Sequence, residues 1–351
     1  MRDWLLVADY VSGALDGAVG FAGRGAVAYA AGRDPAVADV LAVSTGSRAG
    51  AAPPATADEA IRPADVERLF VKIDSTLRGW PVAHVRTALS AWHPGATAVV
   101  CPAAPALGRT VRGGRLLVHG QPAVASAAGA DPVAPATEDR LPVLFDAPLV
   151  AVDDVPGLVG TGPALVVDAV DEADLDRLAA VVESCGPRAV PVGAVGLAAA
   201  LGARRGARAQ ERPRATAPVV LVTSLHPVAT AQLATLGYLV PVVRPPATPD
   251  TRLDHAAATA AARAAARVAA SLVTTHGADA VVVIGGDGTD ALLGALGADG
   301  VEVRGSVLPG TPWGRVRGGD ADGLLLVSRS GGFGGPDDLR RLIRILTEEI
   351  R

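Results

Sequence analysis

The sequence predicts an α/β protein of two domains, each a largely parallel β-sheet flanked by helices. Short apolar runs typical of buried strands alternate with Gly-bearing turns and Ala-rich helical stretches. At 351 residues the chain is too long for one small core. A charged, Pro-bearing stretch without apolar periodicity separates two such halves. We therefore expect a first domain over residues 1–205, a linker over 206–217 and a second domain over 218–351.

In the first domain, each predicted strand leads into a polar loop. The strands are the apolar runs at 5–8, 69–73 and 98–101. A helix is expected to begin near Ser12, and another to cover 81–92. The Ala/Pro-rich stretch at 123–137 is typical of a loop.

The second domain repeats the alternation of strand and helix. Apolar runs at 219–222, 281–284 and 324–327 predict strands, and the latter two lead directly into glycine-rich turns. The stretch at 254–273 is nearly all alanine, which predicts a helix whose small side chains pack close to a sheet.

Composition excludes several classes of function. A formal charge of −4 and a pI near 5.9, with no basic block, argue against nucleic acid or an anionic membrane as the main partner. Two cysteines are too few for a disulfide framework or a zinc site. No apolar run reaches the ~18 residues of a membrane span. We expect a cytoplasmic protein that binds small anions through a few locally placed residues.

Lys72 is the only lysine among 32 basic residues, and it lies in a polar cluster at the end of a predicted strand. Ligands of parallel α/β sheets bind beyond the carboxyl ends of strands. Lys72 and Arg78 are suited to a carboxylate or phosphate, Arg by a bidentate fork and Lys as a point charge. Asp74 and Ser75 can bind sugar hydroxyls or cap the next helix.

Two further strand ends of the first domain carry candidate ligand-binding residues. Asp9 and Ser12 follow the first strand, where a carboxylate and helix N-terminal amides can meet hydroxyls and an anion, although Ser12 can equally be a plain helix cap. Arg109 follows the strand at 98–101, beside a glycine that lets the backbone approach a ligand.

Three strand-end loops of the second domain suggest a phosphate-binding site. A single glycine-rich turn is more often only a tight turn, but three in one domain favour backbone amides and a helix dipole directed at phosphates. Asp287 in one of these turns is available for a magnesium-bound water or a hydroxyl proton. The candidate residues are Ser224, Gly285, Gly286, Asp287, Gly288, Thr289, Gly331 and Gly332.

These motifs together resemble the four-carbon acid sugar kinase family over nearly the whole chain. The specific motif is Lys-x-Asp-Ser-Thr-Leu-Arg-Gly at 72–79. It is accompanied by Asp-x-x-Ser-Gly-Ala at 9–14, Pro-Ala-x-Pro-x-x-Gly-Arg-Thr at 102–110, Gly-x-x-Gly-Leu-Ala at 193–198, Gly-Gly-Asp at 285–287 and Ser-Gly-Gly-Phe-Gly at 330–334.

The resemblance implies an ATP-dependent kinase that phosphorylates a hydroxyl of a tetronate such as threonate, erythronate or a 3-oxo-tetronate. The N-terminal domain would bind the sugar acid, the C-terminal domain ATP, and Mg²⁺ would assist in the cleft between them. Lys72, Arg78 and Arg109 would then hold the substrate carboxylate. Asp287 and Asp74 are the catalytic candidates, while the metal ligands stay open and a homodimer is compatible with the sequence.

Several positions depart from the family pattern. Tyr10 stands where a second acid is usual, His226 replaces a serine, Gly288 is an extra glycine, and Arg329 replaces a common lysine. Two alternatives therefore stay open: a homologue that binds a sugar acid or nucleotide without turnover, and an enzyme akin to NAD or lipid kinases, which share the Gly-Gly-Asp-Gly-Thr turn.

Overall fold

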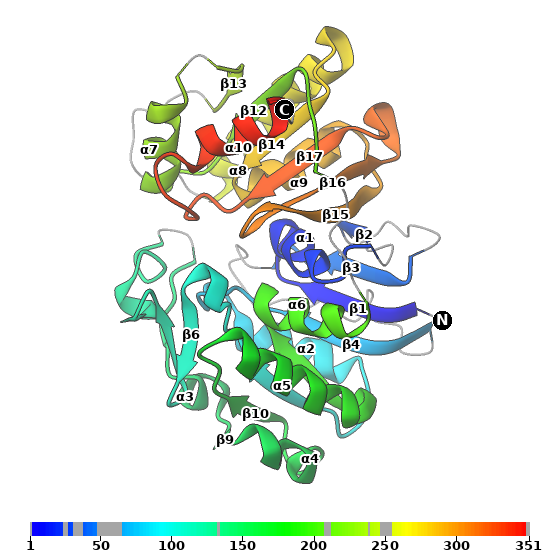
Figure 1. Cartoon of the computed structure of the whole chain (residues 1–351), viewed down its shortest axis with the longest axis vertical. Helices are drawn as coiled ribbons and strands as arrows, with labels where there is room; N and C mark the ends of the chain where they lie inside the picture. Colours follow the sequence, from blue (N-terminus) through cyan, green and yellow to red (C-terminus); the bar gives the residue numbers. More distant parts are fainter. Residues whose placement is uncertain are drawn as a thin grey trace. The chain divides into compact units, whose positions relative to one another are not determined.

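The computed structural model (Figure 1) describes residues 2–23, 27–30, 38–47, 65–131, 134–206, 212–237, 239–245 and 255–348, with only the backbone of 27–30 and 255–256. These residues form two compact units, the first ending at residue 206 and the second starting at 212. Residues 207–211 of the predicted linker lie outside the described part. The exact linker bounds therefore stay a prediction.

The first unit contains a parallel sheet, a small antiparallel sheet and flanking helices. Its strands are β1 (Arg2–Ala8), β2 (Val27–Ala30), β3 (Val40–Ser44), β4 (Val66–Lys72), β5 (Thr97–Cys101), β6 (Arg109–Arg112), β7 (Arg115–Val118), β8 (Gln121–Pro122), β9 (Leu149–Val150), β10 (Ala164–Val167) and β11 (Ala189–Gly193). Its helices are α1 (Val11–Val19), α2 (Pro81–Ser90), α3 (Leu141–Phe145), α4 (Val155–Leu158), α5 (Glu172–Ser184) and α6 (Val195–Arg204).

The large sheet of this unit is parallel and runs in the order β2-β3-β1-β4-β11-β5-β10-β9. Its central strands are continuous apolar runs because helices cover the sheet: α1 packs on β1 and β3, α6 on β11 and α2 on β5. Strands β6, β7 and β8 form the antiparallel sheet.

Glycines let α1 and α6 approach each other closely. A Cβ on Gly20, just after α1, would overlap the backbone of Ala198, and one on Gly202 would overlap the carbonyl of Gly20. Backbone therefore packs against backbone here, which no larger residue permits. This contact fixes α1, and with it the loop that precedes α1, against the sheet.

The second unit is a mixed sheet with helices on both faces. Its elements are β12 (Pro218–Val222), α7 (Pro227–Leu236), β13 (Val242–Val243), α8 (His255–His276), β14 (Ala280–Ile284), α9 (Gly286–Ala295), β15 (Gly300–Leu308), β16 (Thr311–Arg317), β17 (Leu325–Arg329) and α10 (Asp338–Thr347). The order is β13-β12-β14-β17-β16-β15, with β16 antiparallel to both of its neighbours and the other pairs parallel.

Alternate residues of the central strands face two helix layers. Val220, Val282 and Leu325 belong to a buried cluster with side chains of α7 and α10, whereas α8 and α9 pack together and contact the strands as well. Buried alanines of α8 lie against the sheet, as the alanine-rich sequence predicts. The segment before β12 is tied to this unit, because Asp279 accepts hydrogen bonds from Thr216 and Ala217.

The predicted α/β class is confirmed, with its strands and helices near the expected positions. The helix predicted at 81–92 is α2, that at 254–273 is α8, and the stretch at 123–137 contains a short 3₁₀ helix, turns and bends where it is described. Within the described residues, no helix combines the length and apolar character needed to cross a membrane.

Candidate functional site

The carboxyl ends of five neighbouring strands of the first unit lie level with one another. Lys72 of β4 pairs with Ala8 of β1 on one side and Gly193 of β11 on the other, while Ser44 of β3 pairs with Ala8 and Cys101 of β5 with Gly193. The loops that follow these strands therefore gather at one edge of the sheet. They include the loops that carry Asp9, Asp74 to Arg78 and Arg109, so the register brings the predicted sugar-acid residues to the same edge.

Lys72 is a buried cation with little compensation from the protein. Its side chain is 2% exposed and lies beside α1, where a Cβ on Gly17 would be 3.7 Å from its aliphatic stem. Its Nζ donates one hydrogen bond, to the carbonyl of Ile73 at 2.9 Å, and among the described residues no carboxylate forms an ion pair with it. Because a buried ammonium is stable only when paired and hydrogen-bonded, Lys72 is suited to an anionic ligand.

Asp74 organises the loop after β4. Its Oδ2 accepts hydrogen bonds from the Thr76 hydroxyl at 2.6 Å, from the Thr76 and Arg78 amides at 3.3 Å each and from Arg78 Nε at 2.9 Å. Its Oδ1 accepts from Arg78 Nη2 at 3.0 Å. These bonds hold Leu77 at φ +64°, a left-handed conformation that costs a non-glycine residue about 1–2 kcal/mol. Asp74 is thus occupied with the loop and does not cap α2, which begins after Trp80.

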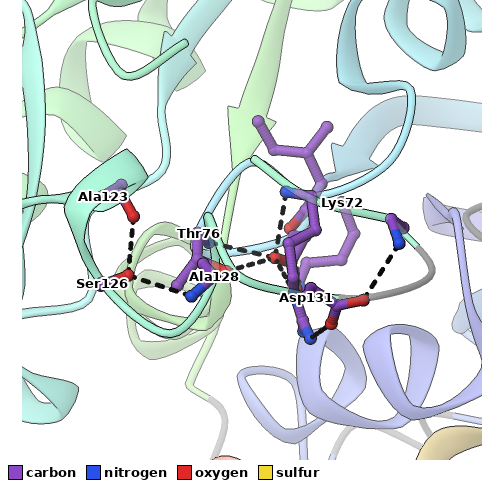
Figure 2. A network of polar contacts seen from close by, with 10 residues as sticks. Lys72, Thr76, Ala123, Ser126, Ala128 and Asp131 are labelled. Atoms are coloured by element: carbon purple, nitrogen blue, oxygen red, sulfur yellow. Dashed lines mark hydrogen bonds and ion pairs between the residues drawn. The ribbon is translucent and has the colours of Figure 1, made fainter. Parts of the chain in front are cut away.

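A second carboxylate, Asp131, also holds Arg78. Arg78 Nη1 donates to Asp131 Oδ2 at 3.0 Å, and the two side chains are about one-fifth exposed. The loop that carries Asp131 is shaped by Ser126, whose hydroxyl donates to the Ala123 carbonyl and accepts from the Ala128 amide. Figure 2 shows this network, in which dashed lines join Ser126 to Ala123 and Ala128. With two carboxylate partners, the charge of Arg78 is largely compensated, unlike that of Lys72.

The other predicted sugar-acid residues lie in this loop or follow neighbouring strands that end at the same edge of the sheet. Arg109 is 8% exposed and donates to the Leu107 carbonyl. Burial lowers the pKa of Arg109, while nearby Asp74 raises it, so the two side chains are electrostatic neighbours. Asp9 and Ser75 are buried. Ser12 is half-buried in the first turn of α1 and does not occupy the N-cap position, which belongs to Tyr10 and has no side-chain capping hydrogen bond.

The second unit also has three aligned strand ends. Val222 of β12 pairs with Ile284 of β14, which pairs with Arg329 of β17. The loops that follow touch one another: a Cβ on Gly331 would overlap the Ser224 side chain, and a Cβ on Gly285 would lie 2.9 Å from the Ser224 amide nitrogen. The three predicted phosphate loops are therefore in contact at one edge of the sheet.

Helix α9 begins at Gly286, so the Gly-Gly-Asp-Gly-Thr sequence is a strand end followed by the first helical turn. Gly288, the extra glycine, lies within that turn, where a Cβ would be 2.7 Å from the Thr223 hydroxyl. It therefore lets α9 approach the β12 loop. The Thr289 hydroxyl lies in the interior, 2.9 Å from the Ser328 hydroxyl, so its side chain serves packing within the unit.

Asp287 lies in the first turn of α9 with its side chain exposed. Partial desolvation and then the neighbouring Asp290 carboxylate raise the pKa of Asp287. Desolvation likewise raises the pKa of Asp290, against an opposing effect of Arg263 on α8. A carboxylate with a raised pKa is a stronger base than an ordinary aspartate.

His226 takes over a structural role at the start of α7. Its Nδ1 accepts the Val228 amide proton at 3.2 Å, which makes His226 the N-cap that a serine would otherwise provide. Its ring also packs against the glycine loop, since a Cβ on Gly332 would lie 3.2 Å from Nε2. The departure from the family pattern is thus accommodated within the unit.

The Gly-x-x-Gly-Leu-Ala motif is explained by packing. A Cβ on Gly193 would lie 2.5 Å from the Cys101 carbonyl oxygen, and one on Gly196 would lie 2.6 Å from that of Ala103. Both glycines let the β11–α6 turn cross close to the end of β5. The two glycines thus shape this edge of the sheet.

Two side chains of these sites carry no local sequence signal. Asp131 lies in an Ala/Pro-rich stretch and Gln232 on the apolar helix α7, yet both hold loops of the predicted sites. The sequence signal that could have identified them is a single polar residue within an apolar or alanine-rich segment. Among the residues that the structure describes, no group of three or more His, Cys, Asp or Glu forms a metal site.

The chain matches two domain families. Residues 4–201 match the family described as "Sugar-binding N-terminal domain", and residues 239–339 match the "Nucleotide-binding C-terminal domain". The first match contains the Lys72 loop, and the second contains the glycine loops after β14 and β17. Together these two domains make up the four-carbon acid sugar kinases.

Curated relatives align with the chain over nearly their full length. A D-threonate kinase of Bordetella bronchiseptica is 39% identical, over 98% of this chain and 97% of the relative. A D-threonate kinase of Salmonella typhimurium is 28% identical, over 95% of this chain and 96% of the relative. The two sequences therefore align with the chain from the sugar-binding through the nucleotide-binding domain.

Solved structures share the fold. A Bordetella bronchiseptica protein crystallised with bound citrate as a domain-swapped dimer is 37% identical, covers 99% of this chain and all of its own, and superposes with a TM-score of 0.53. A Salmonella typhimurium structure described as a putative tRNA synthase reaches a TM-score of 0.77 over 99% of this chain and all of that chain, at 21% identity, which shows the fold alone. On the domain matches and the full-length 39% identity, the chain belongs to the four-carbon acid sugar kinase family.

Proposed function

We propose that the protein is an ATP-dependent kinase that phosphorylates a hydroxyl of a four-carbon sugar acid of the D-threonate type. The observation that carries this proposal is Lys72, a buried ammonium with a single carbonyl partner at the edge of the sugar-binding unit. D-Threonate kinase is the name of the full-length relatives, which supports the same substrate class. The chemistry of Lys72 demands an anion, and a sugar acid supplies one.

In the first unit, Lys72 holds the substrate carboxylate, with Arg109 near it. Arg78 already binds two carboxylates, so it stabilises the loop and offers its remaining N–H donors to the substrate. Asp9 and Ser75, which are both buried, bind substrate hydroxyls. Asp74 keeps the loop in place through its five hydrogen bonds and is not free to act as a base without breaking them.

In the second unit, the glycine loops and the N-terminus of α9 bind the ATP phosphates. Ser224, Gly286 and Gly331 lie at the strand ends where backbone amides and the helix dipole can face an anion. Magnesium is normally held by substrate phosphates and one or two carboxylates, which fits the exposed Asp287 without a dedicated protein cage. The metal would neutralise charge on the phosphates.

Phosphoryl transfer depends mostly on positioning and on charge stabilisation. Asp287 is the candidate for orienting the attacking hydroxyl, since its raised pKa favours proton acceptance, whereas the Asp74 carboxylate is hydrogen-bonded within its loop. The shared Gly-Gly-Asp-Gly-Thr turn gives no separate support to an NAD or lipid kinase, because it lies within the matched nucleotide-binding domain.

The test is ADP release with Mg-ATP against a panel of D-threonate, erythronate and 3-oxo-tetronate. Lys72→Met keeps the length and burial of the side chain but removes its charge. We expect kcat/KM for the sugar acid to fall about tenfold to a hundredfold, as for loss of a charged hydrogen bond, with ATP affinity unchanged. Arg112→Met, which removes an exposed charge of the same unit, is the control.

Two outcomes would contradict the proposal. ATP binding with no turnover of any sugar acid would favour a binding protein without catalysis. An equal loss of ATP affinity in Lys72→Met would show that Lys72 serves the nucleotide. We further propose a homodimer, a state supported by the domain-swapped dimer of the Bordetella bronchiseptica relative.

A further inference from the structure

A buried amide on α7 holds the glycine loop after β17. Gln232 is 0% exposed, and its Nε2 donates to the carbonyls of Phe333 at 3.0 Å and Gly335 at 2.9 Å. One turn further along α7, the Thr235 hydroxyl donates to the carbonyl of Pro336 at 2.7 Å. Helix α7 thus binds three carbonyls of one loop.

A buried guanidinium also holds this loop. Arg329, the last residue of β17, is 2% exposed; its Nη2 donates to the Phe333 carbonyl and lies 3.7 Å from the Asp338 carboxylate. Asp338 also accepts the Gly335 amide proton at 3.1 Å. Gly334, at φ +81°, is the residue that fits, because a Cβ there would overlap both side chains.

Gln232 and Arg329 are energetically unfavourable if they serve only to fill the core. Gln232 Oε1 and Arg329 Nη1 are buried and make no hydrogen bond within the described chain. Burying a polar atom without a partner is unfavourable, so an apolar side chain would serve a plain core better. The hydrogen bonds to the loop carbonyls are what these residues provide.

The carbonyl directions determine where the loop amides point. In a planar trans peptide the C=O and the following N–H point in opposite directions. The Phe333 carbonyl faces Gln232 and Arg329, so the Gly334 N–H faces away from them. Within the described residues, this N–H donates no hydrogen bond, and neither do those of Gly331 and Gly332.

We propose that Gln232 and Arg329 are positioning residues that preset the loop at 330–335 for phosphate, with the Gly334 amide as an additional donor. This inference rests on the proposed nucleotide-binding role of the second unit. Gln232 lies on the helix that follows the Ser224 loop, so the same contact also ties two phosphate loops together. The arrangement selects a polyphosphate anion through backbone donors whose direction is set before binding.

The experiment measures ATP binding by calorimetry without sugar acid, together with hydrogen exchange of the peptide that covers 330–335. In Gln232→Leu and Arg329→Met we expect the Kd for ATP to rise about tenfold, exchange of this loop to accelerate, and the KM for the sugar acid to stay within about twofold. Arg329→Lys, which restores a donor, should recover part of the affinity. Gln121→Leu and Arg341→Met, both exposed positions, are the matched controls.

The milder variant Thr235→Val removes one loop contact at a half-buried position and covers the case in which the buried variants do not fold. It should show a smaller change in the same direction for both ATP affinity and loop exchange. If wild-type protein binds ATP and these variants bind it equally well with unchanged loop exchange, the positioning role is wrong. If wild-type protein does not bind ATP, the proposed nucleotide-binding function itself fails.

Discussion

Arg78 and Lys72 are both basic residues of one motif, yet their surroundings give them different tasks. Arg78 donates to Asp74 and Asp131, whereas Lys72 donates to a carbonyl alone among its described partners. Bidentate guanidinium–carboxylate contacts fix geometry, while a poorly compensated ammonium attracts an anion. Within the motif, Arg78 therefore stabilises the loop, whereas Lys72 is available for an anionic ligand.

Asp131→Asn tests the link between the Ala/Pro-rich loop and the motif. The variant replaces a charge-assisted bond to Arg78 by a neutral one, so we expect the KM for the sugar acid to rise about fivefold, with ATP affinity unchanged. The effect should be smaller than that of Asp74→Asn, which disturbs five hydrogen bonds. Steady-state kinetics with each substrate in turn gives the answer. Asp153→Asn, at an exposed position, is the control, and an equal KM in both variants would show that Asp131 is dispensable.

At this scale the sequence identifies the motif residues but not their partners. Lys72 stands out because the composition is otherwise free of lysine, and Asp74 follows it at a strand end. The interpretation of Asp74 as a hydroxyl ligand stays a prediction, and the structure adds that its carboxylate closes a local turn by accepting the Thr76 hydroxyl proton. Asp131 and Gln232 could not be found, since their roles arise only from contacts 53 and about 100 residues away along the chain.

Helix α9 begins with charges that the fold does not favour. Asp287 and Asp290 lie close enough for Asp290 to raise the pKa of Asp287, at a helix start where a single carboxylate would normally be stabilising. Such a pair is poor for stability. It is useful where a metal ion brings compensating positive charge.

Asp290→Asn should stabilise the second unit at neutral pH. Desolvation raises the folded-state pKa of Asp290 above its unfolded value, so its ionised form is disfavoured in the fold. Below the unfolded pKa there is no penalty, and the penalty grows as the pH rises through the folded pKa. Thermal melts should therefore give the variant a higher Tm than wild type near pH 7 and an equal Tm near pH 3. A difference in Tm between variant and wild type that does not change with pH would show that packing, and not ionisation of Asp290, causes the effect.

The predicted elements are those with continuous apolar runs. The sequence predicts strands β1, β4, β5, β12, β14 and β17 because each contains a continuous run of buried apolar residues. The β15–β16 hairpin has no counterpart among the predictions. In β15 apolar and polar residues alternate, which is a weaker sequence signal than a continuous apolar run. Val301 and Val303 are buried, while Glu302 and Arg304 are partly exposed.

On the scale of the whole molecule, the two proposed ligand sites belong to separate compact units with separate cores. The family matches divide the chain in the same way, with residues 4–201 in one domain and 239–339 in the other. Substrate and nucleotide binding should therefore stabilise different parts of the chain. The α/β class and the two-domain organisation could be predicted from sequence because strand, turn and helix signals repeat on both sides of residues 206–217.

Differential scanning calorimetry tests this division. We expect two thermal transitions, one raised by D-threonate and the other by Mg-ATP. A ligand at about a hundred times its Kd contributes about 2.7 kcal/mol, which corresponds to a few degrees for a unit of this size. Lys72→Met should abolish only the first shift and Gln232→Leu only the second. A single transition that either ligand shifts would show that the units unfold as one cooperative body.

The burial of Lys72 also gives the chain a built-in unfolding probe. A protease specific for lysine has one cleavage site in this sequence, and the bond after Lys72 lies where β4 is hydrogen-bonded between β1 and β11. The enzyme can cut only when that part of the sheet opens, so the cleavage rate reports the opening equilibrium of the sugar-binding unit alone. Two fragments on a gel then measure the local stability of one half of a two-unit protein, without any label.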